Sequence, residues 1–126
     1  EYLEIFGENN FYLEIMENGI PEQTIANQGL IALSKELSIP LIDTNDCHYL
    51  NASHAEAHNV LLCIQTGKTI EDKDRMSMTS DQFYVKSPEE MQTLFAATPE
   101  AISNTVSIAE RCNLTFEFGK FYLPKY

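Results

Sequence analysis

A strand–helix–strand pattern over residues 11–44 limits the fold of this chain more than any other stretch. The β-prone run 11–16 is bounded by asparagine and glycine residues, which predicts a short strand. Pro21 suits the first turn of a helix, and Pro40 follows where that helix cannot continue. The run 41–44 predicts a second strand. Because a helix joins the two strands, we expect them to run parallel, with a right-handed crossover.

After the second strand the pattern changes to helices. Ser53 and Glu56 fit a capping box, in which each side chain bonds the other residue's backbone, and Gly67 fits the end of the helix that follows. A second capping box is expected at Ser87 and Glu90. The apolar positions expected to face inward on the successive helices are Ile25, Gly29, Leu30, Leu33 and Leu37; Ala57, Val60, Leu61 and Ile64; Met91, Leu94 and Phe95; and Ile102, Val106 and Ala109.

Less regular segments separate and follow these helices. Residues 67–82 are polar and predict a loop, whereas residues 83–86 predict a short extended piece. Thr98 and Pro99 are expected to open a last helix, and residues 116–123 to form an extended tail.

The fold class expected from these elements is α/β. We expect residues 1–66 to form a βα portion and residues 67–126 a helix-rich segment. A sheet of two or three strands cannot bury both of its faces unaided. The chain also begins without methionine and ends on an apolar segment. We therefore expect it to be a piece of a longer protein.

The charge distribution argues against nucleic-acid binding by this segment. The formal net charge is −11, and residues 1–66 carry ten acidic side chains against one basic one, Lys35. Proteins that bind nucleic acid normally present a basic patch to the phosphates. The short basic run between Lys68 and Lys86 is interleaved with carboxylates, as in a solvated loop. Little DNA binding is expected from the chain alone.

Cysteine content and hydropathy indicate the cellular compartment. The three cysteines are widely spaced, with no C-x-x-C pair, so we expect free thiols in a reducing cytoplasm; they are Cys47, Cys63 and Cys112. No run approaches the roughly 18–20 apolar residues of a membrane span, so no membrane association is expected.

The pair Asp46 and His48 directly follows the second predicted strand. Loops at the carboxyl ends of parallel strands are where α/β proteins gather functional groups. A carboxylate oxygen and an imidazole nitrogen suit zinc or manganese, which supports hydrolytic chemistry. The alternative is a hydrogen-bonded loop turn, and two donors are fewer than the three or four that zinc takes.

Three other side chains are weaker candidates for the same chemistry. His54 and His58 are four residues apart and share a helix face, but they do not form H-E-x-x-H, and Glu56 between them is expected in the cap. Surface or packing histidines are the alternative. Glu14 lies within an apolar strand, where a carboxylate is either functional or paired.

Several stretches taken together resemble one family. They are Phe6–Gly7, Phe11–Ile15, Asn18–Gly19, Ile39–Leu50, Ala55–His58, Leu61–Thr69, Phe83–Met91, Pro99–Thr105, Ile108–Asn113 and Leu123–Tyr126. In this order and spacing they resemble the α subunits of bacterial DNA polymerase III, over essentially the whole chain. The resemblance implies the last part of the PHP (polymerase and histidinol phosphatase) domain, a (β/α)7-type barrel, followed by a helix-rich segment that leads toward the palm domain.

The resemblance also implies part of a metal site. PHP domains of this family hold divalent metals with His, Asp, Glu and Cys ligands, and a D-x-H near the domain's end supplies the last two, which match Asp46 and His48. Glu14, His54 and His58 match family positions with no assigned metal role. The remaining ligands fall outside this chain, so the chain alone is expected to bind zinc or manganese weakly or not at all.

For the parent protein the resemblance implies DNA-directed DNA synthesis, with DNA and deoxynucleotides as substrates. Its polymerase aspartates fall outside this chain, so no catalysis is expected from the segment itself. The expected partners are the rest of the α subunit and other replicase subunits. A non-catalytic scaffold or interaction module is the main alternative. A self-contained metallophosphoesterase is disfavoured because too few ligands are present.

Overall fold

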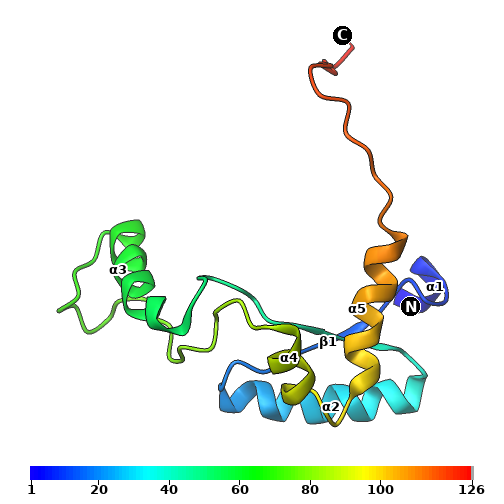
Figure 1. The fold of residues 1–126 in the computed structure, drawn as a ribbon, viewed down its shortest axis with the longest axis horizontal. Helices are drawn as coiled ribbons and strands as arrows, with labels where there is room; N and C mark the ends of the chain where they lie inside the picture. The colour runs from blue at the N-terminus through cyan, green and yellow to red at the C-terminus, as the bar shows by residue number, and fades with distance from the viewer. Residues whose placement is uncertain (126) are drawn as a thin grey trace.

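The computed structural model describes residues 1–125 and has a mixed α/β architecture. Two short parallel strands lie at its centre, among helices, and the C-terminal segment leaves the folded part as an extended tail (Figure 1). In chain order the elements are α1 (Tyr2–Phe6), β1 (Leu13–Met16), α2 (Pro21–Leu37), β2 (Leu41–Thr44), the 3₁₀ turn η1 (Ala52–His54), α3 (Ala55–Thr66), α4 (Pro88–Leu94) and α5 (Pro99–Arg111).

The predicted strand–helix–strand unit is confirmed. β1 and β2 pair in parallel, with Leu13 opposite Leu41 and Ile15 opposite Asp43. β1 begins two residues later than the β-prone run. Helix α2 begins at Pro21, as predicted, because proline supplies the φ of a first turn and has no N–H to leave unpaired. It ends before Ser38, which takes a left-handed φ of 54°. Its predicted inward face is largely wrong: Ile25, Leu33 and Leu37 are exposed, and the residues that pack against the core are Leu30 and Ile31.

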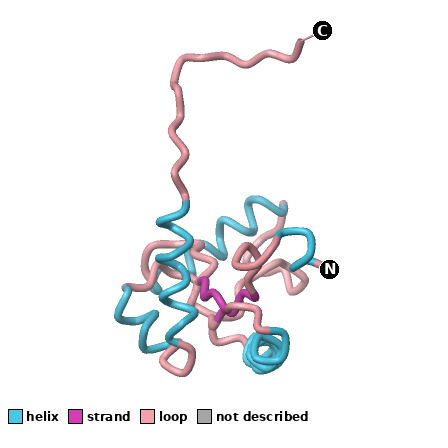
Figure 2. The backbone as a smooth tube through the Cα atoms, turned by 90° about the vertical axis from the view of Figure 1, so that its right-hand side faces the viewer, coloured by secondary structure: helices cyan, strands magenta, loops and turns pink. Residues whose placement is uncertain are grey.

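One face of the sheet carries the hydrophobic core, because alternate residues of a strand point to opposite faces. The buried cluster is Leu13, Ile15, Ile39, Leu41, Phe95 and Ala101. α2 packs against β1 and α5 against β2, and Figure 2 shows the strands enclosed by helices on that side. On the alternate positions Glu14 is exposed, and Ile42 and Thr44 are only half-buried. No helix of residues 1–125 covers this second face.

Helix α3 departs from the prediction in two ways. It begins at Ala55 after η1, and its N-cap residue is His54, without a side-chain cap bond, so the capping box predicted at Ser53 and Glu56 is wrong. The inward face is also wrong: Leu62 and Cys63 are buried, whereas the predicted Val60, Leu61 and Ile64 are exposed. The loop after α3 folds back against the side of α3 opposite to the predicted face, where Met78 N–H donates to Asn59 Oδ1 at 3.0 Å. The predicted end at Gly67 is confirmed, with a left-handed φ of 65°.

Helices α4 and α5 agree with the prediction more closely. Phe95 is buried at the end of α4 as expected, but Leu94 is 39 % exposed. α5 begins at Pro99, as predicted. It packs on β2 through its N-terminal half, where Ala101 is fully buried and Asn104 Nδ2 donates to the Leu41 carbonyl at 2.7 Å. The predicted inward residues Val106 and Ala109 are therefore exposed, which corrects that prediction.

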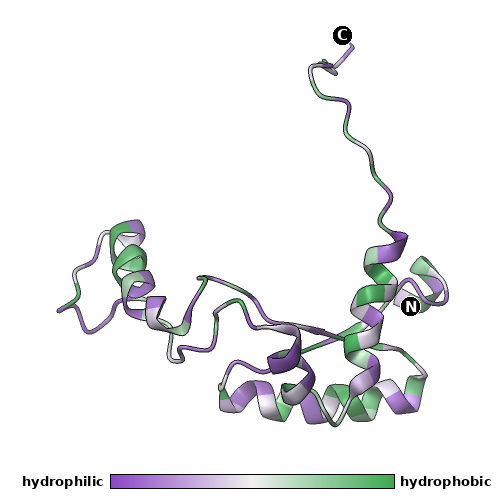
Figure 3. Cartoon of the chain, viewed as in Figure 1, coloured by the Kyte–Doolittle hydropathy of each residue, from purple (hydrophilic) through white to green (hydrophobic). Residues whose placement is uncertain are grey.

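Apolar side chains remain uncovered at the two extremities of the fold. Figure 3 shows apolar residues on α3, which stands away from the sheet, and along the tail after α5. Phe118 and Phe121 in this tail are 95 % and 88 % exposed. No helix within residues 1–125 is long and apolar enough to cross a bilayer.

The capping box at the start of α4 is confirmed in full. Glu90 N–H donates to Ser87 Oγ at 3.2 Å, and Ser87 N–H donates to Glu90 Oε2 at 2.7 Å. The bond from the Ser87 backbone, and then the bond from the Tyr84 hydroxyl, hold the pKa of Glu90 below its ordinary value. The ionised carboxylate is therefore the form that caps the helix.

Replacing Ser87 by alanine is expected to lower the free energy of unfolding by about 1 kcal/mol, because the Glu90 N–H loses its acceptor. Urea denaturation followed by circular dichroism measures this change. Ser107→Ala, at an exposed position of α5, is the matched control and should change the stability by less than about 0.5 kcal/mol. Equal effects of the two substitutions would contradict the prediction.

Candidate metal site after strand β2

The loop that leaves β2 turns sharply and is held by a later segment of the chain. Asp46 takes a left-handed φ of 52°, which is unusual for a residue with a side chain. Two residues on, His48 N–H donates to the Phe83 carbonyl at 2.8 Å. Tyr49 then forms a parallel bridge with Tyr84. The extended piece expected near residue 83 thus pairs with the loop and fixes its outer end.

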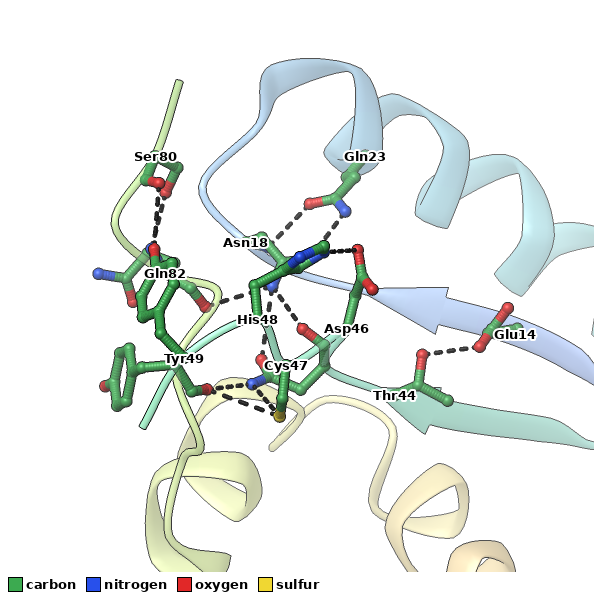
Figure 4. Close-up of polar contacts among 12 residues, drawn as sticks. Glu14, Asn18, Gln23, Thr44, Asp46, Cys47, His48, Tyr49, Ser80 and Gln82 are labelled. Atoms are coloured by element: carbon green, nitrogen blue, oxygen red, sulfur yellow. Dashed lines mark hydrogen bonds and ion pairs between the residues drawn. The ribbon is translucent and has the colours of Figure 1, made fainter. Parts of the chain in front are cut away.

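Asp46 and His48 point toward one another (Figure 4). His48 Nε2 lies 3.2 Å from Asp46 Oδ2, and the two side chains are 33 % and 55 % exposed. Two ligand atoms on a tetrahedral zinc, each about 2.1 Å from the ion, are roughly 3.4 Å apart. The observed separation is close to that value, so the pair fits two adjacent coordination positions around such an ion. It fits a direct ion pair equally well.

His58 approaches this pair from α3. Its ring lies edge-on to His48, with ring centroids 5.2 Å apart, and is tilted against Tyr49 at 5.4 Å. Its Nδ1 is buried and has no hydrogen-bond partner among the described residues. His54 lines the same hollow, together with His48, Tyr49 and His58. The structure therefore brings all three histidines of the chain to one side of the loop.

Glu14 is separate from this group. Its Oε1 accepts a hydrogen bond of 2.7 Å from the Thr44 hydroxyl, on the uncovered face of the sheet (Figure 4). The carboxylate is thus paired across the two strands and turned away from Asp46. Cys47, between the two candidate ligands, points to the opposite side and is an exposed free thiol.

The donor set in this chain is small. Within residues 1–125, no three or more His, Cys, Asp or Glu side chains are grouped closely enough to hold a metal ion. A metal on Asp46 and His48 would therefore need further ligands from outside the described residues.

Asn18, which the sequence reasoning did not single out, is fully buried beside the loop. Its side chain hydrogen-bonds Asn45, the residue before Asp46. The Lys86 ammonium also donates to Asn45, at 2.8 Å, and burial lowers the pKa of this lysine. The signal that could have pointed to Asn18 is its place at the carboxyl end of β1, next to the loop after β2.

Comparison with known proteins gives no match to any family model. Curated relatives do match, and all three named here are DNA polymerase III α subunits. The one from Campylobacter jejuni is 47 % identical over 125 residues, covering 99 % of this chain and 10 % of that protein. The one from Borreliella burgdorferi is 46 % identical over 126 residues, with 99 % and 11 % covered. The one from Pseudomonas aeruginosa is 39 % identical over 126 residues, with 100 % and 11 % covered.

These relatives match nearly every residue of this chain, whereas the chain spans only about a tenth of their length. Such identity over more than 100 residues, repeated among relatives from different organisms, indicates common ancestry. The chain is therefore identified as a segment of the DNA polymerase III α-subunit family.

Proposed function

We propose that this chain is the last part of the PHP domain in the α subunit of a bacterial replicative polymerase, and that Asp46 and His48 supply two ligands of its divalent-metal site. The observation that carries the metal assignment is the 3.2 Å contact between His48 Nε2 and Asp46 Oδ2 at the carboxyl end of β2. In this proposal the parent subunit synthesises DNA from deoxynucleotides, and the rest of that subunit is the main partner of this segment.

The arrangement of the sheet supports a place in a larger barrel. Helices cover one face of β1 and β2, while the other face bears Glu14 and Thr44 and lacks a cover within residues 1–125. In a β/α barrel the helices lie outside, and alternate strand residues point into the barrel. The uncovered face would then line the barrel interior, and further strands would pair with the free edges of the two-stranded sheet.

The residues of this chain would hold the metal at the rim of that barrel. His48 Nε2 and Asp46 Oδ2 would be the donor atoms, and the bond from His48 N–H to Phe83 fixes the backbone between them and the sheet. Zinc or manganese bound there would polarise a phosphoryl oxygen and lower the pKa of a bound water. The packing of His58 against His48 restricts the imidazole's rotation and so maintains the direction of its nitrogen.

A scaffold function is the second candidate. It is favoured by the absence of a three-donor group in the described part of the chain and by the exposed apolar residues of α3 and the tail. In this alternative Asp46 and His48 form only an ion pair, and the apolar surfaces contact the rest of the α subunit.

The metal content of the α subunit that contains this chain tests the proposal. His48→Ala and Asp46→Asn are each expected to weaken zinc or manganese binding by at least about tenfold, because each removes a ligand, and even supporting residues of metal sites cost that much. Elemental analysis after dialysis, followed by titration of the stripped protein, measures this loss.

His54→Ala is the matched control, because His54 lies in the same hollow but forms no hydrogen bond or ion pair with Asp46; it should retain the metal. The isolated 126-residue chain should bind metal only weakly. Unchanged metal in the His48 and Asp46 variants would favour the scaffold function.

A further inference from the structure

Asn18 is a fully buried polar residue whose side-chain oxygen and nitrogen both form hydrogen bonds. It follows β1, and none of its surface is exposed. Its Oδ1 accepts a bond of 2.9 Å from Gln23 Nε2, and its own backbone N–H donates to Gln23 Oε1 at 2.8 Å. These two bonds from the first turns of α2 fix the orientation of the Asn18 amide (Figure 4).

The Asn18 amide nitrogen joins segments that are distant in the sequence. Nδ2 donates to the Asn45 carbonyl at 2.9 Å, with the Asn45 side-chain oxygen at 3.4 Å and the Gln82 carbonyl at 3.3 Å. One amide therefore connects the end of β1, the end of β2 and the segment that precedes α4. Buried polar groups with every bond made hold the surrounding backbone in a single arrangement.

The bond to Asn45 acts directly on the candidate ligands. Asn45 precedes Asp46, whose φ of 52° lies in the left-handed region, which is uncommon for a residue with a side chain although aspartate tolerates it better than most. Hydrogen bonds hold the residues on either side of Asp46. Before it, the Asn18 amide donates to the Asn45 carbonyl; after it, His48 N–H donates to the Phe83 carbonyl. Lys86 adds a bond of 2.8 Å to Asn45 Oδ1.

We propose that Asn18 is a positioning residue for the Asp46–His48 pair: its buried amide holds Asn45 so that Asp46 turns its carboxylate toward His48. The position that Asn18 gives to Asn45 and Asp46 rests on the hydrogen bonds alone. Its effect on metal binding rests on the proposed metal site. A donor amide is required, because an acceptor at the same place would face the carbonyl oxygens of Asn45 and Gln82.

The test uses Asn18→Asp in the α subunit that contains this chain. The substitution keeps the size of the side chain and replaces the donor by an acceptor. Asn27→Asp is the matched control, because Asn27 Nδ2 donates to the Met16 carbonyl at 2.7 Å and forms no hydrogen bond with the loop after β2. Gln23→Ala, which frees the Asn18 amide without introducing a charge, is the second variant if Asn18→Asp does not fold.

Two readouts separate positioning from general stability. Zinc titration of the metal-stripped protein is expected to show affinity about 10–100-fold lower for Asn18→Asp, the usual cost of losing a supporting residue at a metal site, and within twofold of wild type for Asn27→Asp. The alkylation rate of Cys47, measured by peptide mass spectrometry, reports the conformation of the loop in the metal-free protein. It should rise at least fivefold in Asn18→Asp and stay unchanged in Asn27→Asp.

The outcomes distinguish this inference from the proposed function. If His48→Ala leaves metal binding unchanged, the metal site is wrong, and the Cys47 alkylation rate alone then decides whether Asn18 holds the loop. If Asn18→Asp matches wild type in Cys47 alkylation, the positioning inference is overturned. It is equally overturned if Asn27→Asp raises the rate by the same factor, because Asn18 would then only stabilise the fold.

Discussion

Replacing Phe95 by alanine is expected to lower the free energy of unfolding of the 126-residue chain by about 3–5 kcal/mol. Phe95 is 5 % exposed and belongs to the buried cluster with Leu13, Ile15 and Leu41. Its ring connects the end of α4 to the sheet, so its removal leaves a cavity where a helix meets the strands. Urea denaturation followed by the helical circular dichroism signal measures the loss.

Phe118→Ala is the matched control for this substitution. Phe118 is 95 % exposed in the tail, so its truncation removes almost no buried surface and should change the stability by less than about 0.5 kcal/mol. A loss below about 1 kcal/mol for Phe95→Ala would mean that α4 does not pack on the sheet in solution.

Replacing Asp43 by asparagine is expected to raise the free energy of unfolding near pH 7 by roughly 1 kcal/mol or more, because the neutral amide avoids the desolvation cost of the ionised carboxylate. Asp43 is 5 % exposed, on the core face of β2 opposite Ile15. Its Oδ1 has no hydrogen-bond partner within residues 1–125. Burial raises the pKa of this carboxyl above its ordinary value of 3.8, against a smaller opposite effect of a backbone hydrogen bond.

The sign of the pH dependence follows from this shift. Because the pKa of Asp43 is higher in the folded chain, the folded state holds the proton more tightly than the unfolded state does. The stability contributed by the protonated carboxyl is present below about pH 3.8 and is lost as the pH rises to the folded-state pKa. Above that pKa the loss is constant.

Urea denaturation of wild type and Asp43→Asn at a series of pH values measures this effect, and the difference between the two curves isolates Asp43 from the other carboxylates. Glu36→Gln, at an exposed position of α2, is the matched control and should give a difference curve close to zero. A wild-type chain that gains stability relative to Asp43→Asn as the pH rises would contradict the assigned shift.

The parts of the fold that follow from neighbouring residues were predicted correctly. Pro21 and Pro40 delimit α2, and the capping box at Ser87 forms because its two partners are only three residues apart. The predicted inward faces of α3 and α5, and most of that of α2, were wrong because they depend on which distant surface meets each helix. The loop around Met78 covers α3 on the side opposite to the predicted apolar face.

The candidate site likewise has contacts that follow from neighbouring residues and contacts that depend on distant segments. The convergence of Asp46 and His48 is local, since only one residue, Cys47, lies between them, and the sequence indicated it. The approach of His58 requires that α3 be placed against the loop, which no local pattern specifies. The contact of Asn18 with Gln82 spans 64 residues, so periodicity and short motifs carry no information about it.

The bonds that join Asn45 and His48 to residues 83–86 have a consequence for synthesis of the protein on the ribosome. When β2 emerges from the exit tunnel, the segment that fixes the following turn has not yet emerged. At about 5–20 residues per second, the roughly 40 residues from His48 to Lys86 take about 2–8 s to add. During this interval the emerged chain carries Asp46 and His48 without the contacts from residues 83–86, so the turn of the folded structure is complete only after Lys86 has emerged.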